Sequence, residues 1–121
     1  MLKIQKKLFG EATKIRATAR CRVVAALVLR GKVISIGHNS YNSCRLARQF
    51  SKHEMAVYNH AEINAIHSFL KKHSIKKLQK CTLYVCRAKM DRGKFIYGSS
   101  KPCCGCMKAI RFFKIKKVVY V

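Results

Sequence analysis

The chain is poor in acidic residues, proline and glycine. Only four of its 121 residues are acidic and 27 are Lys or Arg, so the formal net charge is +23. One proline and six glycines exclude collagen-like and other fibrous classes. Half of the residues are apolar and lie in organised runs, which excludes a disordered chain in spite of the charge. The length predicts one domain over residues 1–121 with a single core.

Long apolar segments are absent too. The longest apolar run, Val23–Leu29, is far shorter than the roughly 20 residues that a membrane-spanning helix needs. The first ten residues are interrupted by lysines and have no small-residue cleavage site, so no secretory signal is expected. Cysteines number seven, an odd count, and three of them lie within Cys103–Cys106. We therefore expect no membrane partner, a reducing cytoplasmic location, and a metal site rather than a disulfide framework.

The positive charge has two interpretations. It could reflect a Lys-rich composition that only keeps the protein in solution. It could instead indicate a polyanionic partner, because each phosphate that a cation neutralises releases counterions and strengthens binding. A free mononucleotide needs only one or two cationic contacts, and this chain has many more. We therefore favour a polyanionic partner.

Apolar spacing predicts an α/β chain. Residues 38–58 are polar and basic, and we expect mostly loop there, with a helical turn near Leu46–Phe50. The remaining expected elements, in chain order, are a helix over 2–17, a hairpin of Cys21–Leu29 and Val33–Gly37, a helix over His60–His73 capped by Asn59, a strand over Cys81–Cys86, a turn at Asp91–Lys94 into a short strand over Phe95–Tyr97, a helix from Pro102, and a last strand over Lys117–Val121. This order predicts a three-layer α/β sandwich with a mixed sheet and crossover helices.

Two segments that open expected helices carry metal-ligand residues. One is His60-Ala61-Glu62 and the other is Pro102–Cys106. One imidazole and two thiolates, from His60, Cys103 and Cys106, make three zinc ligands and leave a fourth position for water, which is typical of a catalytic site. Glu62 is placed to act as the general acid and base. An alternative is a structural site of four thiolates that adds Cys81 and Cys86. Cys104 is expected to be a packing residue, with a role as fourth ligand left open.

These segments resemble the signature of the cytidine and deoxycytidylate deaminases, H-x-E followed by P-C-x-x-C. The resemblance covers nearly the whole chain, and His60–Ile66 is similar to the deoxycytidylate version of the motif. It implies one zinc ion per chain, attack by zinc-activated water on the amino-bearing carbon of cytosine, and proton transfer through Glu62, so that ammonia leaves and uracil forms. It also implies that Asn39 contacts the sugar and that the backbone around Ala61 and Ser100 holds the pyrimidine edge.

The chain departs from the family pattern in two places. Pro102 follows Cys86 by sixteen positions, where relatives need only a few. We expect this extra segment to contact a single strand through its basic and aromatic residues: Arg87, Lys89, Arg92, Lys94, Phe95, Tyr97 and Lys101. The sequence also stops where many relatives continue into a further strand and helix, which predicts an exposed sheet edge and self-association into a homo-oligomer.

Three functions remain open at this point. The favoured one is zinc-dependent deamination of cytosine to uracil in single-stranded DNA or RNA. The second is deamination of free deoxycytidylate or cytidine in nucleotide metabolism. Deamination of adenine, or a non-catalytic nucleic-acid-binding role with a structural zinc, is expected less.

Overall fold

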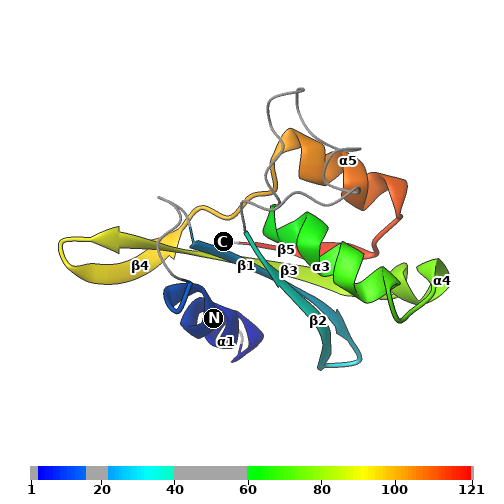
Figure 1. Cartoon of the computed structure of the whole chain (residues 1–121), viewed down its shortest axis with the longest axis horizontal. Helices are drawn as coiled ribbons and strands as arrows, with labels where there is room; N and C mark the ends of the chain where they lie inside the picture. The colour runs from blue at the N-terminus through cyan, green and yellow to red at the C-terminus, as the bar shows by residue number, and fades with distance from the viewer. Residues whose placement is uncertain (1–2, 16–21, 40–59, 121) are drawn as a thin grey trace.

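The computed structural model describes residues 3–15, 22–39 and 60–120. Helices and strands are interspersed along the chain (Figure 1). Their bounds are α1 Lys3–Thr13, β1 Arg22–Leu29, β2 Lys32–His38, α3 Ala61–Leu70, α4 Ile75–Leu78, β3 Thr82–Asp91, β4 Lys94–Gly98, α5 Cys104–Phe112 and β5 Lys117–Val119.

The strands form one mixed sheet in the order β2-β1-β3-β4, and β5 also pairs with β3. All pairs are antiparallel except β3 with β5, which is parallel. Strand β3 is long enough to pair with β5 at its start, where Thr82 faces Lys117, and with β4 at its end, where Asp91 faces Lys94. Between these pairings the Ser100 hydroxyl donates a hydrogen bond of 3.0 Å to the Val85 carbonyl. The chain leaving β4 is therefore held beside the middle of β3 on its way to α5.

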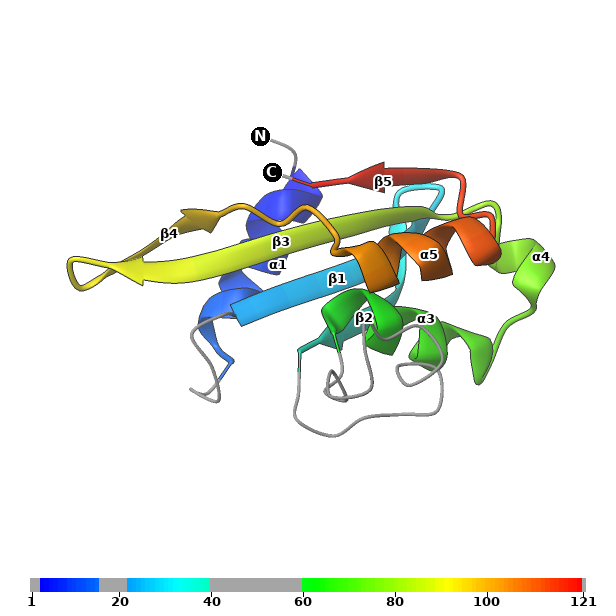
Figure 2. The ribbon, with the colours of Figure 1, turned by 90° about the horizontal axis from the view of Figure 1, so that it is seen from above.

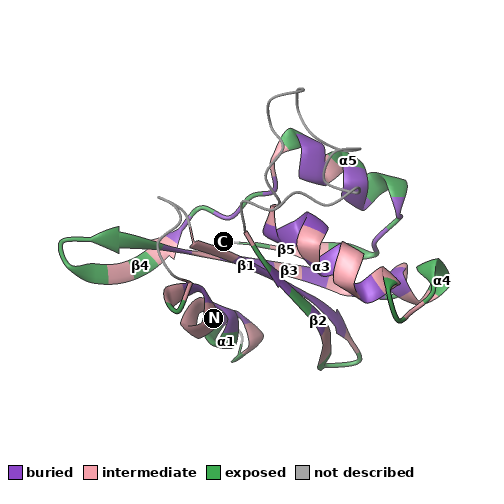
Figure 3. Cartoon of the chain, viewed as in Figure 1, coloured by how far each residue is buried: buried purple, intermediate pink, exposed green. Residues whose placement is uncertain are grey.

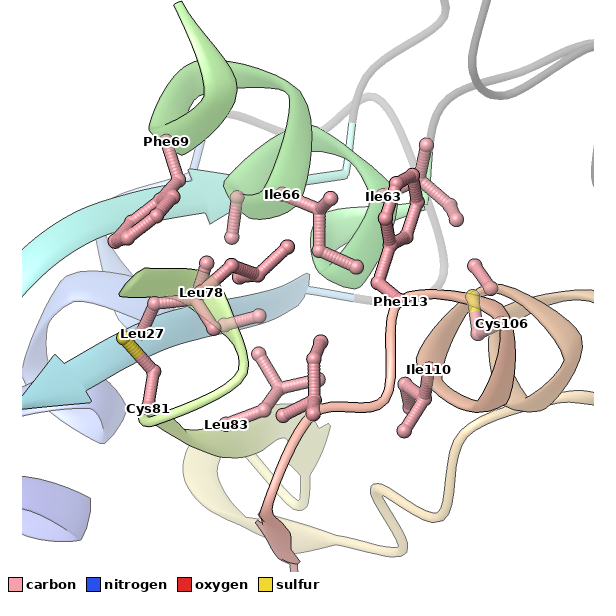
Figure 4. Packing of buried hydrophobic residues seen from close by; sticks show 14 of the residues in the cluster. Leu27, Ile63, Ile66, Phe69, Leu78, Cys81, Leu83, Cys106, Ile110 and Phe113 are labelled. Atoms are coloured by element: carbon pink, nitrogen blue, oxygen red, sulfur yellow. The ribbon is translucent and has the colours of Figure 1, made fainter. Parts of the chain in front are cut away.

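The sheet separates two layers of helix (Figures 1 and 2). Helices α3 and α5 cover one face, which we call the α3/α5 face, and α1 covers the other, the α1 face. The core of the α3/α5 face is built around Leu27, Ile66, Phe69 and Leu83 (Figure 4). Together the three layers confirm the predicted α/β sandwich with a mixed sheet.

Strand β1 is buried on both faces, which explains its unbroken apolar sequence. Ala25 and Leu27 face α3 and α5, whereas Val24, Ala26 and Val28 face α1. Burial along the chain follows this division, with the β3–β4 turn exposed (Figure 3). The expected turns are confirmed: Arg30-Gly31 and Arg92-Gly93 all have positive φ, as two-residue hairpin turns require.

Several element boundaries differ from the expected ones. The first two helices are shorter than expected, and His60 is the N-cap of α3 instead of its first residue. Strand β3 runs to Asp91 instead of ending at Cys86, because it forms a two-stranded ribbon with β4 that needs no apolar core. The short helix α4 was not expected; its cap is the Ser74 side chain, which accepts a hydrogen bond of 3.2 Å from the Lys77 amide.

The last helix and strand are shorter as well, with α5 starting at Cys104 and β5 ending at Val119. The proposed cap Asn59 and the proposed turn at Leu46–Phe50 lie outside the described residues. Across the described part of the chain, no helix combines the length and the apolar character that crossing a membrane requires.

Candidate metal centre and active site

Helix α3 lies very close to strand β2, and this contact places the start of the helix. A Cβ atom on Gly37 would come within 2.6 Å of the Ala61 carbonyl oxygen and would overlap the Ala65 amide nitrogen. The Ser35 hydroxyl donates to the Ala65 carbonyl at 2.8 Å, and the Asn64 side-chain amide donates to the His38 carbonyl at 3.0 Å. Glycine at position 37 is therefore required for the observed position of His60, one residue before the helix.

Helix α5 begins at the same place above the sheet. Cys103 is its N-cap, and the Met107 amide donates to the Cys103 carbonyl at 2.8 Å. Neither His60 nor Cys103 uses its side chain to cap its own helix. Both side chains therefore face the space between the two helix ends, where Cys106 joins them from the first turn of α5.

His60, Cys103 and Cys106 form a compact group of donors. The His60 Nδ1 atom lies 3.3 Å from the Cys103 sulfur and 3.4 Å from the Cys106 sulfur, and all three donor atoms lie within 4.8 Å of one another. Usual Zn–N and Zn–S bond lengths in a tetrahedral site place such nitrogen and sulfur atoms about 3.6 Å apart. The three residues therefore fit a single zinc ion after only a small expansion.

The charges in this group call for a cation. A hydrogen bond with Cys106, and a second with His60, lower the pKa of Cys103 to about 3. The same hydrogen bond with Cys103 raises the pKa of Cys106, and burial and the nearby Glu62 carboxylate raise it further. Without a cation the pair therefore favours one thiolate and one thiol. A divalent ion would stabilise the second thiolate, which is the usual state of a zinc ligand.

Glu62 lies in the first turn of α3, beside the donor group. It is buried, with 5% of its surface exposed, and its carboxyl group contacts the Cys106 thiol. Burial raises the pKa of Glu62, against a hydrogen bond from its own backbone and the charge of His60. A buried carboxyl group with a raised pKa, next to a group of metal-ligand residues, is a candidate general acid and base.

Cys81, Cys86 and Cys104, the other cysteines of the described residues, do not join this group. Among the described residues, His60, Cys103 and Cys106 form the one set of three such side chains with metal-binding geometry. Cys86 lies in the core of the α1 face, and the Cys81 thiol donates to the Lys77 carbonyl at 3.4 Å. The alternative of a four-thiolate site is therefore not supported. Cys104, expected to pack inside, is exposed.

Of the three residues expected to contact substrate, Ala61 follows the ligand residue His60 directly, Ser100 lies shortly before Cys103, and Asn39 follows strand β2. The side-chain oxygen of Asn39 accepts a hydrogen bond of 3.0 Å from the Val23 amide. Ala61 is fully buried at the first position of α3. Ser100 is also buried, bonded to Val85 just before Pro102 and the second motif.

The basic and aromatic residues expected to form one track are divided between the two faces. Tyr97 stacks on Phe9 of α1 at 4.1 Å between ring centroids, and Phe95 lies 5.1 Å beneath the Arg22 guanidinium. Both aromatics therefore pack on the α1 face, which corrects their expected place beside the site. Register puts the basic residues Arg87 and Lys89 on the α3/α5 face. The other three cations are exposed: Arg92 and Lys94 at the hairpin tip, and Lys101 before Pro102.

Sequence reasoning missed the residues that position α3 on β2. The sequence pattern predicted Gly37 only as the last residue of a strand, and it assigned no role to Ser35 or Asn64. One signal was available, because a glycine inside an alternating strand often marks the close approach of another backbone. Nothing in the sequence identified α3 as that backbone.

With this geometry established, comparison with known proteins is informative. Residues 2–121 match the model of the cytidine and deoxycytidylate deaminase zinc-binding region. The chain belongs to the cytidine and deoxycytidylate deaminase family. It is a zinc-dependent hydrolytic deaminase, and His60, Cys103 and Cys106 are placed to bind one zinc ion. The expected family, fold class and cofactor are confirmed.

Two solved structures are similar in fold. One is the apo dCMP deaminase from the cyanophage S-TIM5, with 21% sequence identity and a TM-score of 0.61 over 98% of this chain and 82% of that one. The other is guanine deaminase from Bacillus subtilis, with 23% identity and a TM-score of 0.54 over 98% of this chain and 60% of that one. Among curated proteins, none matches the chain.

Proposed function

We propose that this deaminase converts cytosine to uracil in single-stranded nucleic acid. The observation that carries the choice of a polymer is the formal net charge of +23 on a chain that holds a deaminase site. Within the described residues there is a single ion pair, 3.7 Å between Lys14 and Glu11, so the other cations lack acidic partners there. A surface of this kind favours a substrate with many phosphates.

The residues of the site have distinct roles in this proposal. When bound, zinc lowers the pKa of a coordinated water toward neutrality, so that hydroxide is available near pH 7. The Glu62 carboxylate carries one proton of the attacking water to the ring nitrogen. It then carries the second, from the hydroxyl group now on the attacked carbon, to the leaving amino group. One water is consumed and one ammonia released. Because Glu62 is buried, bulk water does not compete for these protons.

Substrate contacts in this proposal come from Ala61, Ser100 and Asn39. The buried backbone at Ala61 and Ser100 holds the polar edge of the pyrimidine, and Asn39 contacts the sugar. The target base must be unpaired or extruded, because the donor group lies between two helix ends that a stacked base pair could not enter.

Exposed cations supply the binding surface beyond the donor group. Arg92 and Lys94 stand at the tip of the β3–β4 ribbon, which extends beyond the helices (Figure 2). Lys89 lies between the tip and the site on the same strand, and Lys101 immediately precedes the second motif. A strand of nucleic acid that follows the ribbon to the site would meet these side chains in turn.

Free deoxycytidylate is the second candidate. The observation in its favour is the segment His60–Ile66, which is similar to the deoxycytidylate deaminase version of the motif.

A cytoplasmic location and self-association at a sheet edge accompany either candidate as predictions. All five cysteines in the described residues are free thiols, which supports a reducing compartment.

The deciding experiment offers cytidine, deoxycytidylate, single-stranded DNA and single-stranded RNA to the zinc-loaded protein and identifies the products by mass spectrometry. We expect uracil in a polymer, with binding that weakens as salt rises, at a logarithmic slope of about −0.7 per phosphate contacted. Reversing the charges of Arg92 and Lys94 should reduce polymer turnover and leave nucleoside turnover unchanged. Efficient turnover of deoxycytidylate with no change in the oligonucleotides would establish the second candidate instead. Inosine without uracil would overturn the choice of base.

Glu62→Gln tests the assignment of the proton carrier. The amide keeps the shape of the side chain but carries no transferable proton of suitable pKa, so turnover should fall by about 10²–10⁴-fold. Zinc content and unfolding temperature should stay near those of the wild type. Glu11→Gln, on α1, is the matched control and should retain full activity. Near-normal turnover of Glu62→Gln would move proton transfer to another group.

A further inference from the structure

Arg87 occupies a defined row of the sheet beside the metal centre. The Asn39 amide donates to the Val23 carbonyl at 3.2 Å, Val23 faces Arg87 across β1 and β3, and Arg87 faces Gly98 across β3 and β4. Residues directly opposite each other in antiparallel strands project from the same face. Val23 packs against the core of the α3/α5 face, so Arg87 lies on that face as well.

This row lies just beyond the ends of the two motif helices. The preceding row on the same face is Gly37, Ala25 and Val85, and the first turn of α3 packs on Gly37. Two residues of a strand advance by about 7 Å. The direction is from Ser35, which contacts Ala65, to Gly37, which contacts Ala61, and thus toward the start of α3. Arg87 therefore lies one row beyond the start of α3, on the same face of the sheet as the donor group.

The Arg87 side chain is held against Gly98. A Cβ atom added to Gly98 would lie 3.0 Å from Cδ and 3.2 Å from Cγ and Nε of Arg87. Any side chain at position 98 would displace the arginine. Its aliphatic part therefore lies across the glycine, and the direction of its guanidinium group is restricted.

The Arg87 Nε atom is buried and has no hydrogen-bond acceptor among the described residues. Buried donors of this kind are normally paired. The acids of the described residues do not pair with it: Glu11 pairs with Lys14, Glu62 lies at the donor group, and Asp91 is at the exposed hairpin tip. The geometry leaves a charged donor, fixed in place beside the site, without an anion from this part of the chain.

We infer that Arg87 binds the phosphate group of the nucleotide whose base enters the site. A guanidinium group matches the geometry of a phosphate and forms paired, charge-assisted hydrogen bonds with it. The inference rests on the proposed function in one respect, that the substrate is a nucleotide. The phosphate is a monoester in free deoxycytidylate and a diester in a strand, and both offer the same oxygen atoms.

Arg87→Ala and Arg87→Lys test this role, with Arg111→Ala on the exposed side of α5 as a control that removes the same group elsewhere. Affinities of deoxycytidine, deoxycytidylate and a short single-stranded oligonucleotide are measured by calorimetry in a Glu62→Gln background, where turnover is slowed by about 10²–10⁴-fold. We expect Arg87→Ala to lower the affinity for the ligands that carry a phosphate by about tenfold or more. The affinity for deoxycytidine should not change. Arg87→Lys should recover part of the loss.

A neutral methylphosphonate on the 5′ side of the target cytosine identifies the phosphate concerned. When Arg87 is present, this linkage should lower the affinity for the oligonucleotide about as much as Arg87→Ala does. In the Arg87→Ala variant, the linkage should not lower the affinity further. Loss of deoxycytidylate affinity alone assigns Arg87 to the monoester, and loss of oligonucleotide affinity alone assigns it to the diester. Equal weakening of deoxycytidine, or additive effects of the variant and the neutral linkage, would overturn the inference. The proposed function is tested separately, by measuring whether the wild-type protein deaminates the same ligands.

Discussion

The two faces of the sheet differ in how much structure covers them and in what they carry. In the described residues the core of the α3/α5 face has 16 buried members, contributed by α3, α4, α5 and the strands, whereas that of the α1 face has seven. The donor group and Glu62 lie entirely on the first face. The described part of the α1 face holds aromatic and cation–π contacts but no group with the geometry to bind a metal.

This difference shows what the metal centre depends on. His60 and Cys103 each precede a helix, so their positions are set by where α3 and α5 rest on the core. Cys106 is itself part of that core (Figure 4). A close-packed core transmits small displacements instead of absorbing them. Disturbing the α3/α5 face should therefore change both folding and metal binding, and disturbing the α1 face should change folding alone.

The largest effect is expected when a ligand is removed. Cys106→Ala should lose stoichiometric zinc and all measurable deamination, and the loss of metal should lower the unfolding temperature, because zinc binding contributes to folding free energy. Cys86→Ala is the matched control, a thiol equally buried but on the α1 face. It should keep one zinc per chain by metal analysis. One zinc ion per chain in Cys106→Ala would contradict the assignment of Cys106 as a ligand and the dependence of the metal centre on the α3/α5 face.

Gly37→Ala should have the next largest effect on the metal centre. Its methyl group cannot fit between β2 and α3, so the helix must move away from the sheet and carry His60 with it. Overpacking of this kind costs about 1–3 kcal/mol. We expect a lower unfolding temperature together with weaker zinc binding, measured by competition with a chelator. Normal zinc affinity in a destabilised variant would show that the site is independent of the α3–β2 contact.

The sequence predicted the metal centre well for a physical reason. Cys103 and Cys106 are close along the chain, so local geometry alone brings them together, and the family motif then supplies His60 and Glu62 as partners. The length of β3 was not predictable in the same way. Its last residues, Lys89 to Asp91, are exposed and lack an apolar pattern, and they are a strand only because β4 pairs with them.

The division of the basic and aromatic residues could have been predicted from the turn. A two-residue turn at Arg92-Gly93 pairs Asp91 with Lys94, and every later pair follows from that register. Tyr97 then faces Ala88, one position from Arg87 and so on the opposite face. Taking the turn as four residues instead hid this alternation. The partner of that face, Phe9 on α1, is distant in sequence and carries no signal of its own.

Leu8→Ala tests the α1 face directly. Leu8 is completely buried against the sheet on that face, and truncating it should cost about 2–5 kcal/mol of the free energy of unfolding. Folded protein should nevertheless bind one zinc ion and turn over substrate at the wild-type rate. Metal analysis and turnover are measured well below the unfolding temperature. A loss of zinc from the folded variant would show that the two faces are coupled through β1.

The smallest effect is expected at Gly10, a glycine on the α1 face that serves as a matched control for Gly37. Gly10 lies within α1, and a Cβ atom there would meet nothing within 4 Å. Alanine restricts the unfolded chain and favours the helix, so Gly10→Ala should stabilise the protein by about 0.5–1 kcal/mol. Thermal unfolding should show a rise of a few degrees, with zinc affinity and turnover unchanged. The same substitution thus changes the free energy of unfolding in opposite directions on the two faces. A methyl group at Gly37 would collide with the backbone of α3, whereas one at Gly10 has open space around it. If Gly10→Ala destabilised the protein or weakened zinc binding, α1 would have to contact more than the described residues show, and the distinction between the two faces would fail.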